Sequence, residues 1–281
     1  MKIDINTKMI TLLGKPLGQS FAARMQNAGY EAAGLNMLYF YTEVDKDHLG
    51  DVVNGLRYMN FAGFAVTKPN KVRVLRYLDE LDPLCKKMGA SNTVVKTPEG
   101  KLIGYNTDGV GFYTSLVEEG KINVEESTFF CFGAGGAGRA MCSVLAYHGA
   151  KKIYITDFYE PCAESLVMDI NENFAPVAEL VHHGDYAKIA ECNVVMNASG
   201  IGMGSTIGQT PMPVEHIQPG QFYFDACYNP DKTQFLLNAE EKGCQVLNGL
   251  GMSLYQGAAQ IELWTGEKAP VEAMRKELMD I

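Results

Sequence analysis

A glycine-rich stretch in the middle of the chain has the spacing of a dinucleotide-binding loop. It lies between an apolar run over 128–132 and a helical pattern, and its G-x-G-x-x-G glycines are Gly133, Gly135 and Gly138. Such glycines permit a tight turn, close approach of a pyrophosphate, and packing of the helix on the strand. The alternative is a turn selected only for packing. The predicted cofactor-binding residues of this loop are Gly133, Ala134, Gly135, Gly136, Ala137 and Gly138.

An acidic residue follows at the distance that a dinucleotide-binding unit requires. Asp157 ends the apolar run KIYITD, 19 residues after Gly138, where a carboxylate can accept hydrogen bonds from both ribose hydroxyls of adenosine. A 2′-phosphate would be repelled there, and the segment DFYE has no Arg or Lys to bind one. We therefore predict NAD as the preferred cofactor, with NADP as second choice. The alternative is that Asp157 only caps the next helix.

Polar residues also follow strand-like runs in the first half of the chain. FAVTKPNK places Thr67 and Lys71 after one apolar run, and GYNTDGVG places Asn106, Thr107 and Asp108 after another. If the glycine-rich unit binds a dinucleotide, these residues are where the substrate site is expected. The alternative is a surface Lys71 and an Asp108 that only caps the following helix.

The elements that position the first set of residues form one α/β unit. Apolar runs alternate with helical patterns from Met9 to about Asn106, which predicts a mainly parallel sheet. NTVVKTPEGKLIGYN adds two β-branched runs around a Pro-Glu-Gly turn and predicts a hairpin. The predicted helices cover 21–33, 45–58 (opened by Asp45 as a cap), 70–78 and 108–119.

A second alternation begins at about residue 128 and predicts a doubly wound, Rossmann-type domain. We therefore expect an α/β protein of two domains with a cleft between them. Residues 113–248 form the cofactor domain, and residues 1–112 with 249–281 form the substrate domain. The predicted helices cover 137–148, 160–172, 185–191 and 232–242, and two closing helices cover 250–265 and 270–279.

Composition excludes several other classes of protein. The 281 residues carry a net charge of −9 with no basic cluster, so we expect no nucleic-acid partner. The longest apolar stretches are far shorter than the ~20 residues that span a bilayer, and the N-terminus lacks an apolar signal core; we expect a soluble, cytoplasmic protein. The seven cysteines lack a C-x-x-C pair and the five histidines lack metal-ligand spacing, so no disulfide framework or metal site is expected.

Several strings of the sequence together are similar to one known family. GFAVTKPNK, ASNTVV, GKLIGYNTDGVGF, GAGGAGRA, NASGIGM, DACYNPDKTQFLLNAEEKG and NGLGMSLYQGAAQ resemble, in order and across almost the whole chain, the shikimate/quinate dehydrogenases. The resemblance implies hydride transfer between a nicotinamide and a ring hydroxyl of a cyclic polyhydroxy acid. It also implies that Lys71 and Asp108 are the catalytic pair, and that the segment from about Gly249 returns to the first domain.

The physical chemistry of that pair agrees with the implied reaction. When a hydride leaves the carbinol carbon, the hydroxyl must lose its proton, and a cation beside the oxygen stabilises the developing charge. A lysine paired with a carboxylate has its charged form favoured. It is therefore a good proton donor in reduction and a reluctant base in oxidation, and which of Lys71 and Asp108 carries the proton stays open.

The resemblance assigns further residues to the substrate and the cofactor. Each assignment has a plainer alternative: backbone capping for Asn92, a surface amide for Gln256, and core packing for the tyrosine and the methionines. The implied substrate-binding residues are Ser20, Thr67, Asn92, Thr107, Tyr228 and Gln256. The implied cofactor residues outside the glycine-rich loop and Asp157 are Asn197, Ala198, Met203, Gly249 and Met252.

The sequence departs from the family in the loop that holds the substrate carboxylate. The family usually has His-Ser-x-Ser-Pro there, whereas this chain has Gln19, Ser20, Phe21, Ala22 and Ala23. One hydroxyl donor is therefore missing. A lost hydrogen bond to a charged group weakens binding roughly ten- to a hundredfold unless it is replaced. Ser20 either binds the carboxylate or caps the helix that begins at Phe21.

Three functions are consistent with these observations. The first is an NAD(P)-dependent dehydrogenase of shikimate or quinate, acting as a monomer or homodimer. The second is a dehydrogenase of the same family for a different cyclic hydroxy acid, suggested by Ala22 and by Ala65, which stands where the family often has asparagine. The third is a nucleotide-binding regulator without turnover, against which the presence of both Lys71 and Asp108 argues.

Overall fold

The chain folds into two compact units, as described by a computed structural model for residues 3–18 and 20–279. The first unit contains the described residues up to Val110 and those from Leu254 onward, and the second unit is Gly111–Ser253. Both boundaries fall inside helices instead of linkers, near the expected positions after 112 and 248. These helices are α4 (Thr107–Glu118) and α8 (Leu250–Thr265).

The first unit is built on a mixed six-stranded sheet. Most neighbouring strands are parallel, and the hairpin of β5 and β6 supplies the antiparallel pairs, as the β-branched runs around Pro98-Glu99-Gly100 predict. In spatial order the strands are β2 (Met37–Glu43), β1 (Lys8–Gly14), β3 (Phe61–Val66), β5 (Thr93–Lys96), β6 (Leu102–Tyr105) and β4 (Glu80–Leu81).

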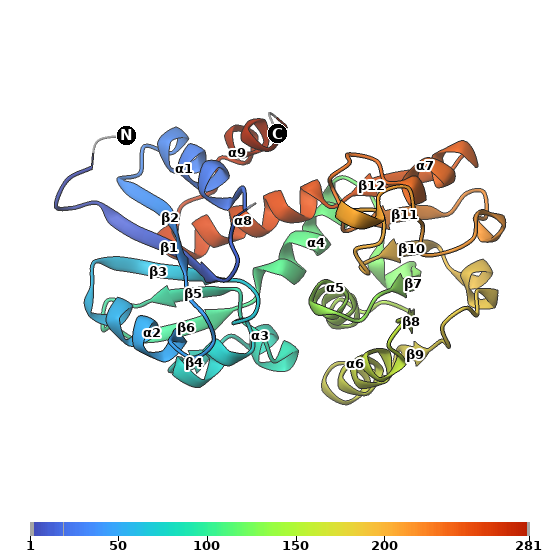
Figure 1. Cartoon of the computed structure of the whole chain (residues 1–281), viewed down its shortest axis with the longest axis horizontal. Coiled ribbons are helices and arrows are strands. Elements are labelled where there is room, and N and C mark those ends of the chain that lie inside the picture. The colour runs from blue at the N-terminus through green and yellow to red at the C-terminus, as the bar shows by residue number, and fades with distance from the viewer. Residues whose placement is uncertain (1–2, 19, 280–281) are drawn as a thin grey trace. The chain divides into compact units, whose positions relative to one another are not determined.

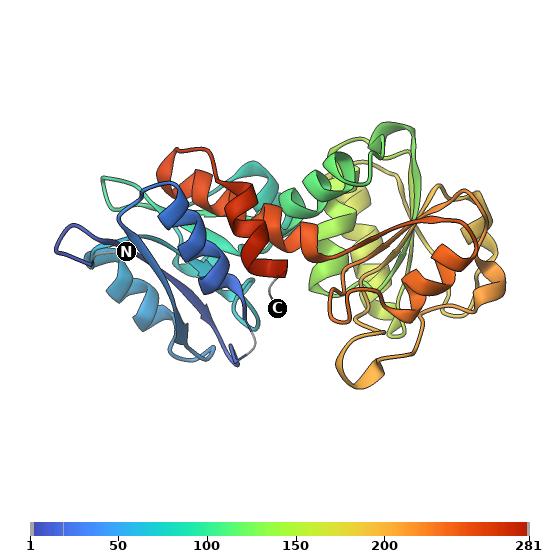
Figure 2. The ribbon, with the colours of Figure 1, turned by 90° about the horizontal axis from the view of Figure 1, so that it is seen from above.

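Helices cover both faces of this sheet (Figures 1 and 2). Helix α8 packs on one face, where the indole of Trp264 donates to the carbonyl of Val94. Glycines let the neighbouring helices approach closely: a Cβ at Gly29 would lie 2.7 Å from Ile261 and 3.1 Å from Met274. The helices of that face are α1 (Ala22–Ala32), α8 and α9 (Val271–Met279), whereas α2 (Leu49–Tyr58) packs on the opposite face, against the core of Leu13, Phe64 and Val66.

Local structure in this unit differs from the sequence prediction in three places. Helix α2 begins at Leu49 instead of 45, because the Asp45 carboxylate accepts from the amides of Asp47 and His48 and so closes a turn before the helix. The segment predicted as a helix over 70–78 forms only a short 3-10 helix, Arg73–Tyr77. Strand β4 and helix α3 (Pro83–Met88) were not predicted, although Asp82 followed by Pro83 is a helix-start signal.

The second unit is a fully parallel, doubly wound sheet. Counted along the chain, its strand order is 3-2-1-4-5-6, the arrangement that binds dinucleotides where the order reverses. That reversal lies between β7 and β10. In spatial order the strands are β9 (Ala178–Leu180), β8 (Lys152–Thr156), β7 (Thr128–Phe132), β10 (Val194–Asn197), β11 (Phe222–Asp225) and β12 (Gln245–Asn248).

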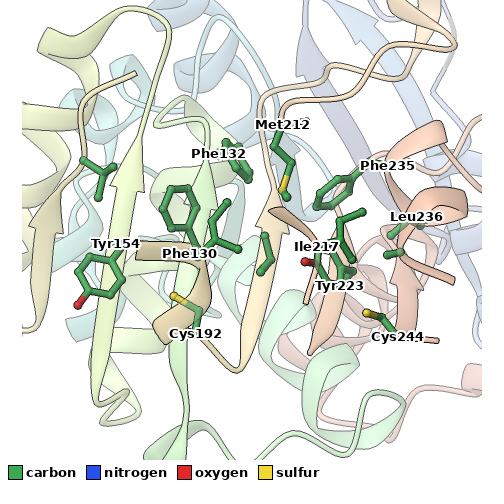
Figure 3. Packing of buried hydrophobic residues seen from close by; sticks show 14 residues of the cluster. Phe130, Phe132, Tyr154, Cys192, Met212, Ile217, Tyr223, Phe235, Leu236 and Cys244 are labelled. Carbon is green, nitrogen blue, oxygen red and sulfur yellow. The ribbon is translucent and has the colours of Figure 1, made fainter. Parts of the chain in front are cut away.

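A buried aromatic core holds one face of this sheet (Figure 3). Phe130 and Phe132 of β7 point to the same face because alternate residues of a strand do so, and Phe132 meets the ring of Phe235 edge-on at 6.4 Å. On the other face Phe112 of α4 meets Phe224 at 4.9 Å.

The helices of this unit are α5 (Gly136–Tyr147), α6 (Glu160–Asn173) and α7 (Gln234–Glu241). The predicted helix over 185–191 is instead a 3-10 helix, Ala187–Glu191. Within the described chain, every helix is too short or too polar to cross a membrane.

Candidate active site

A pocket of about 190 Å³ in the first unit collects most of the predicted substrate residues. It opens at the carboxyl ends of β1 and β3, where the strand residues Leu12 and Ala65 lie beneath the polar groups. This is the edge at which α/β sheets bind ligands. The pocket is lined by Leu12, Ser20, Ala22, Tyr39, Ala65, Val66, Thr67, Lys71, Asn92, Asp108, Gln256 and Gln260.

Lys71 and Asp108 form an ion pair in this pocket. Lys71 Nζ donates to Asp108 Oδ2 at 2.6 Å, with 32% of the lysine side chain and 16% of the aspartate side chain exposed. Lys71 follows a turn in which the Asn70 amide donates to the carbonyl of Thr67. Asp108 lies in the first turn of α4, where the helix dipole favours a negative charge. The pair is thus assembled from residues 37 positions apart and keeps partial access to solvent.

Asn92 connects this pair to the sheet. Its Nδ2 donates to Asp108 Oδ1 at 2.8 Å and to Thr107 Oγ1 at 3.0 Å. Its Oδ1 accepts from the amide of Thr107 at 2.7 Å and from Thr93 Oγ1 at 2.9 Å. The buried Asn92 amide therefore fixes the start of α4 and, with it, the second oxygen of Asp108. Asn92 therefore also has the capping role that was its plainer alternative. Its side-chain oxygen caps the start of α4 at Thr107, and its side-chain nitrogen binds the carboxylate of Asp108.

Gln256 and Gln260 complete the polar wall of the pocket from α8. Gln256 Oε1 lies 3.4 Å from Asn92 Nδ2, and Gln260 Nε2 donates to Thr93 Oγ1 at 2.9 Å. Gln260 Oε1 in turn accepts from Gln26 Nε2 at 3.0 Å. Sequence reasoning missed Gln260, Thr93 and Tyr39. The position of Gln260, one helical turn after Gln256, is the signal in the sequence that could have identified it.

Two of the predicted substrate residues, Thr107 and Tyr228, are absent from the lining of this pocket. Thr67 lines the pocket and is half-buried, and its amide donates to the carbonyl of Leu13. Tyr228 belongs to the second unit. Burial raises the pKa of the Tyr228 hydroxyl, so this side chain stays neutral and can act as a hydrogen-bond donor.

Ser20 lies at the pocket and also at the start of α1. Its Oγ accepts from the amide of Ala22 at 3.3 Å, a weak bond, while α1 itself begins one residue later than expected. The hydroxyl of Tyr41 donates to the Ser20 carbonyl at 2.5 Å and accepts from the amide of Ala23 at 3.0 Å. Tyr41 thus anchors the loop in which the second serine of the family is replaced by Ala22. Gln19 lies outside the described residues.

The glycine-rich loop in the second unit has the geometry that an anion site needs. Gly133 has φ +100°, and a Cβ on Gly138 would lie 1.9 Å from the carbonyl oxygen of Gly133. Gly135 precedes α5 without a side-chain cap, and Gly135 and Gly136 are exposed with open space around them. The first amides of α5 are therefore accessible to a pyrophosphate.

Asp157 lies beside this loop at the end of β8. Its Oδ2 accepts from the amide of Ala134 at 2.7 Å, and its Oδ1 accepts from the amide of Tyr159 at 2.8 Å. The carboxylate thus ties the loop to β8 and closes the turn before α6, while each oxygen keeps a second lone pair. It shares a pocket of about 290 Å³ with the loop, lined by Phe132, Gly133, Gly135, Thr156, Asp157, Phe158, His183, Ala198, Ser199, Ile201 and Pro211.

A buried carboxylate orders the segment after β10, where Ala198 lines this pocket. Asp225 is fully buried, and its two oxygens accept from Asn197 Nδ2, each at 3.1 Å, and from Thr233 Oγ1 at 2.6 Å. Asn197 Oδ1 accepts from Ser199 Oγ at 2.6 Å. Burial raises the pKa of Asp225, and its hydrogen bonds partly offset that rise. Asn197 therefore acts behind the pocket wall, through the residues that follow it.

The remaining predicted cofactor residues lie outside that wall. Met203 is 42% exposed, Met252 is half-buried in α8, and a Cβ on Gly249 would lie 2.1 Å from the carbonyl oxygen of Ala226. Sequence reasoning missed Phe158 and His183, and treated the histidines as ordinary residues. Among the residues that the structure describes, there is no cluster of three or more His, Cys, Asp or Glu side chains that could hold a metal ion.

Comparisons with known proteins identify the family to which this chain is similar. Residues 12–94 match the model of the shikimate dehydrogenase substrate binding domain, and residues 249–279 match that of the shikimate 5′-dehydrogenase C-terminal domain. The chain is 40% identical over 281 residues to the shikimate dehydrogenase (NADP(+)) of Desulforamulus reducens. That alignment covers 99% of this chain and 96% of the relative.

Solved structures give the same result. Shikimate 5-dehydrogenase from Listeria monocytogenes, crystallised with shikimate and NAD, superposes with a TM-score of 0.94 at 37% identity and 98% coverage of both chains. Quinate dehydrogenase from Corynebacterium glutamicum, in complex with NAD, superposes with a TM-score of 0.91 at 28% identity, covering 98% of this chain and 99% of that one. On the full-length identity to its relatives, the chain belongs to the shikimate dehydrogenase family.

Proposed function

We propose that this protein is an NAD(P)-dependent oxidoreductase that interconverts shikimate and its 3-dehydro ketone. The observation that carries this function is the Lys71–Asp108 pair in a polar pocket of the substrate-binding unit. The family's curated members are shikimate dehydrogenases, and the Listeria relative binds shikimate with NAD. A regulator without turnover is not favoured, since it would have no need for the ion pair.

The cofactor, when bound, accepts a hydride in the oxidation and supplies one in the reduction. Its site fits the residues present: the exposed amides at the start of α5 for the pyrophosphate, and Asp157 for ribose hydroxyls. The bare backbone at Gly135 leaves room for close approach, because no atom lies within 4 Å of a Cβ placed there.

Lys71 is the proton-carrying residue of this proposal. In the reduction its ammonium group donates a proton to the oxygen of the ketone as the carbon receives the hydride, and in the oxidation the amine takes that proton back. Both oxygens of Asp108 already accept hydrogen bonds, from Lys71 and from Asn92. Asp108 therefore holds the lysine in place and balances its charge.

The substrate is held by neutral polar groups around the pair. We assign hydroxyl recognition to Thr67, Asn92, Thr107 and Gln256, which are joined to the pair or line its pocket. We assign the carboxylate to Ser20, with its loop anchored by Tyr41. Burial raises the pKa of Tyr39 far above its usual range, so this pocket residue offers a neutral hydroxyl.

NAD is the proposed preferred cofactor. The pocket that contains Asp157 has no Lys or Arg among its lining residues, whereas a 2′-phosphate carries about −1.5 to −2 charge and needs cationic partners. Relatives include proteins that use either cofactor. Asp157 and Phe158 are the residues of this chain that support the choice.

The experiment that tests this function is a spectrophotometric assay of the purified protein. Shikimate and quinate are each supplied at millimolar concentration with NAD or NADP, and reduced cofactor is followed by absorbance. We expect turnover of shikimate, with quinate slower or absent. Binding of NADH without turnover of either acid would contradict the proposal and would indicate a substrate site refitted around Ala22 and Ala65.

Ser20→Ala separates the two roles of this serine. Within the described part of the chain its hydroxyl accepts one hydrogen bond, from the amide of Ala22, and that bond is long, at 3.3 Å, so we expect little loss of stability. Loss of a hydrogen bond to a carboxylate costs about 1.5–3 kcal/mol, so we expect the KM for shikimate to rise about tenfold or more, at nearly constant Tm. A lower Tm with an unchanged KM would instead assign Ser20 to capping; Tyr41→Phe is the matched test of the loop anchor.

A further inference from the structure

Two buried glutamines lie behind the polar wall of the substrate pocket. Gln26 of α1 is fully buried and Gln260 of α8 is 2% exposed, and Gln26 Nε2 donates to Gln260 Oε1 at 3.0 Å. A buried amide that lacks part of its hydrogen bonds is costly, and Gln26 Oε1 has no partner among the described residues. Two apolar side chains of similar size would avoid that cost. Stability alone therefore does not account for this pair.

A backbone carbonyl sets the direction of the hydrogen bonds in this network. Gln26 Nε2 also donates to the carbonyl oxygen of Gly257 at 3.1 Å, and a carbonyl oxygen can only accept. The nitrogen of the Gln26 amide must therefore face α8, and Gln260 must turn its oxygen toward it. The two helices come this close because Gly257 has no side chain: a Cβ there would overlap Met25 and would lie 3.3 Å from Gln26 Nε2.

Gln260 in turn orients Gln256, one helical turn earlier in α8. Gln260 Oε1 accepts a second hydrogen bond, from Gln256 Nε2 at 3.3 Å, while Gln260 Nε2 donates to Thr93 Oγ1 at 2.9 Å. Because the Gln256 nitrogen is turned toward Gln260, the Gln256 oxygen lies at the pocket, 3.4 Å from Asn92 Nδ2. Gln256 thus presents an acceptor to which a hydroxyl of the substrate can donate.

We propose that Gln260 is a positioning residue for the substrate and that it acts through Gln256. It holds the Gln256 amide with the oxygen toward the substrate, and Gln26 and Thr93 hold Gln260 itself. This inference rests on the proposed function, since the orientation matters only for a substrate that carries hydroxyls. Without Gln260 the Gln256 amide is free to rotate, so the acceptor is no longer ordered before the substrate binds and binding becomes weaker.

The test measures the Kd for shikimate by calorimetry without cofactor, the KM for shikimate with NAD, and the Tm. Gln260→Met removes the amide at nearly constant length. We expect this change to raise the Kd and the KM for shikimate about three- to tenfold and to lower the Tm, while the KM for NAD stays within about twofold. Adding Gln26→Met removes the buried amide that the single change leaves without its partner. In this double variant the Tm should recover and the Kd for shikimate should stay raised.

Two controls distinguish positioning from a general effect of losing a buried amide. Gln221 is a buried glutamine of the second unit, and its Nε2 donates to the carbonyls of Ile189 and Cys192. Gln221→Met should therefore lower the Tm and leave the Kd for shikimate unchanged. In a protein that already carries Gln256→Ala, Gln260→Met should change the Kd by less than about twofold, because the residue through which Gln260 acts is gone.

The outcomes separate this inference from the proposed reaction. The inference is overturned if Gln260→Met binds shikimate like the wild type, if the double variant regains affinity together with its Tm, or if Gln260→Met costs as much affinity beside Gln256→Ala as it does alone. Each of these results is compatible with turnover of shikimate. A wild-type protein that binds shikimate without turnover contradicts the proposed reaction, and the Kd values of the variants still decide the inference. A wild-type protein that does not bind shikimate overturns both.

Discussion

Replacing Lys71 with methionine is expected to lower kcat for shikimate oxidation about a hundred- to ten-thousandfold. Methionine has a similar length but has no proton to donate or accept, and positioned acid–base groups contribute about 10²–10⁴ to rate. The KM for NAD should change little, because Lys71 belongs to the substrate pocket and not to the pocket of the glycine-rich loop. Steady-state kinetics with each substrate varied in turn measure both quantities.

Lys71→Arg distinguishes proton transfer from structural pairing. Arginine keeps the ion pair with Asp108 but is effectively always protonated, so the variant should keep its Tm and remain as slow as Lys71→Met. Recovery of activity in Lys71→Arg would show that charge alone is needed and would contradict a proton-carrying role. Lys68→Met, an exposed lysine in the same turn, is the control and should retain wild-type kinetics.

A preference for NAD over NADP of more than tenfold in kcat/KM is the second large effect that we expect. It follows from Asp157, whose carboxylate would stand beside a 2′-phosphate with no Lys or Arg in the pocket lining. Two like charges about 4 Å apart repel by about 1 kcal/mol per unit pair even in water. Asp157→Asn should therefore shift the ratio of the two kcat/KM values about tenfold toward NADP.

The ratio is the appropriate measurement because Asp157 also has a structural task. Its two oxygens accept hydrogen bonds from the amides of Ala134 and Tyr159. Because asparagine has only one acceptor oxygen for these two amides, we expect kcat/KM to fall with NAD and with NADP alike. Asp185→Asn makes the same change of charge on an exposed residue and should leave the ratio unchanged. A preference of the wild-type protein for NADP would contradict the prediction.

Short-range signals allowed much of the fold to be predicted. Parallel strands buried on both faces are continuous apolar runs, so β7, β8 and β10 were recognisable, and the hairpin of β5 and β6 was marked by its turn residues. The ends of helices were harder to predict where a residue that could cap the helix forms a turn instead. Asp45 has the residue type of a helix cap, but its carboxylate closes a turn, and α2 begins four residues later.

The residues of the candidate site also fall into those that local sequence predicts and those that it does not. Gly138 was predictable from spacing alone, because only a residue without a Cβ fits against the carbonyl of Gly133. Gln260 and His183 were not, because each works through partners far away in the chain: Gln260 contacts Thr93, 167 residues earlier, and His183 contacts Phe158 from another loop. Apart from the position of Gln260 one helical turn after Gln256, neither residue carries a local pattern that distinguishes it from a surface residue.

The sequence by itself determined the two α/β units and the glycine-rich loop, since these depend on periodicity, turn chemistry and motifs within about thirty residues. It also supplied Lys71 and Asp108 as the proposed catalytic pair, through the resemblance of several strings to one family. The tertiary structure alone decided that Lys71 and Asp108 meet at 2.6 Å, that Asn92 holds the second carboxylate oxygen, and that Phe158 stands exposed beside Asp157. The physical reason is that hydrogen bonds and ring contacts act over a few ångströms. The residues that share them are brought together by the packing of strands and helices, which no local stretch of sequence records.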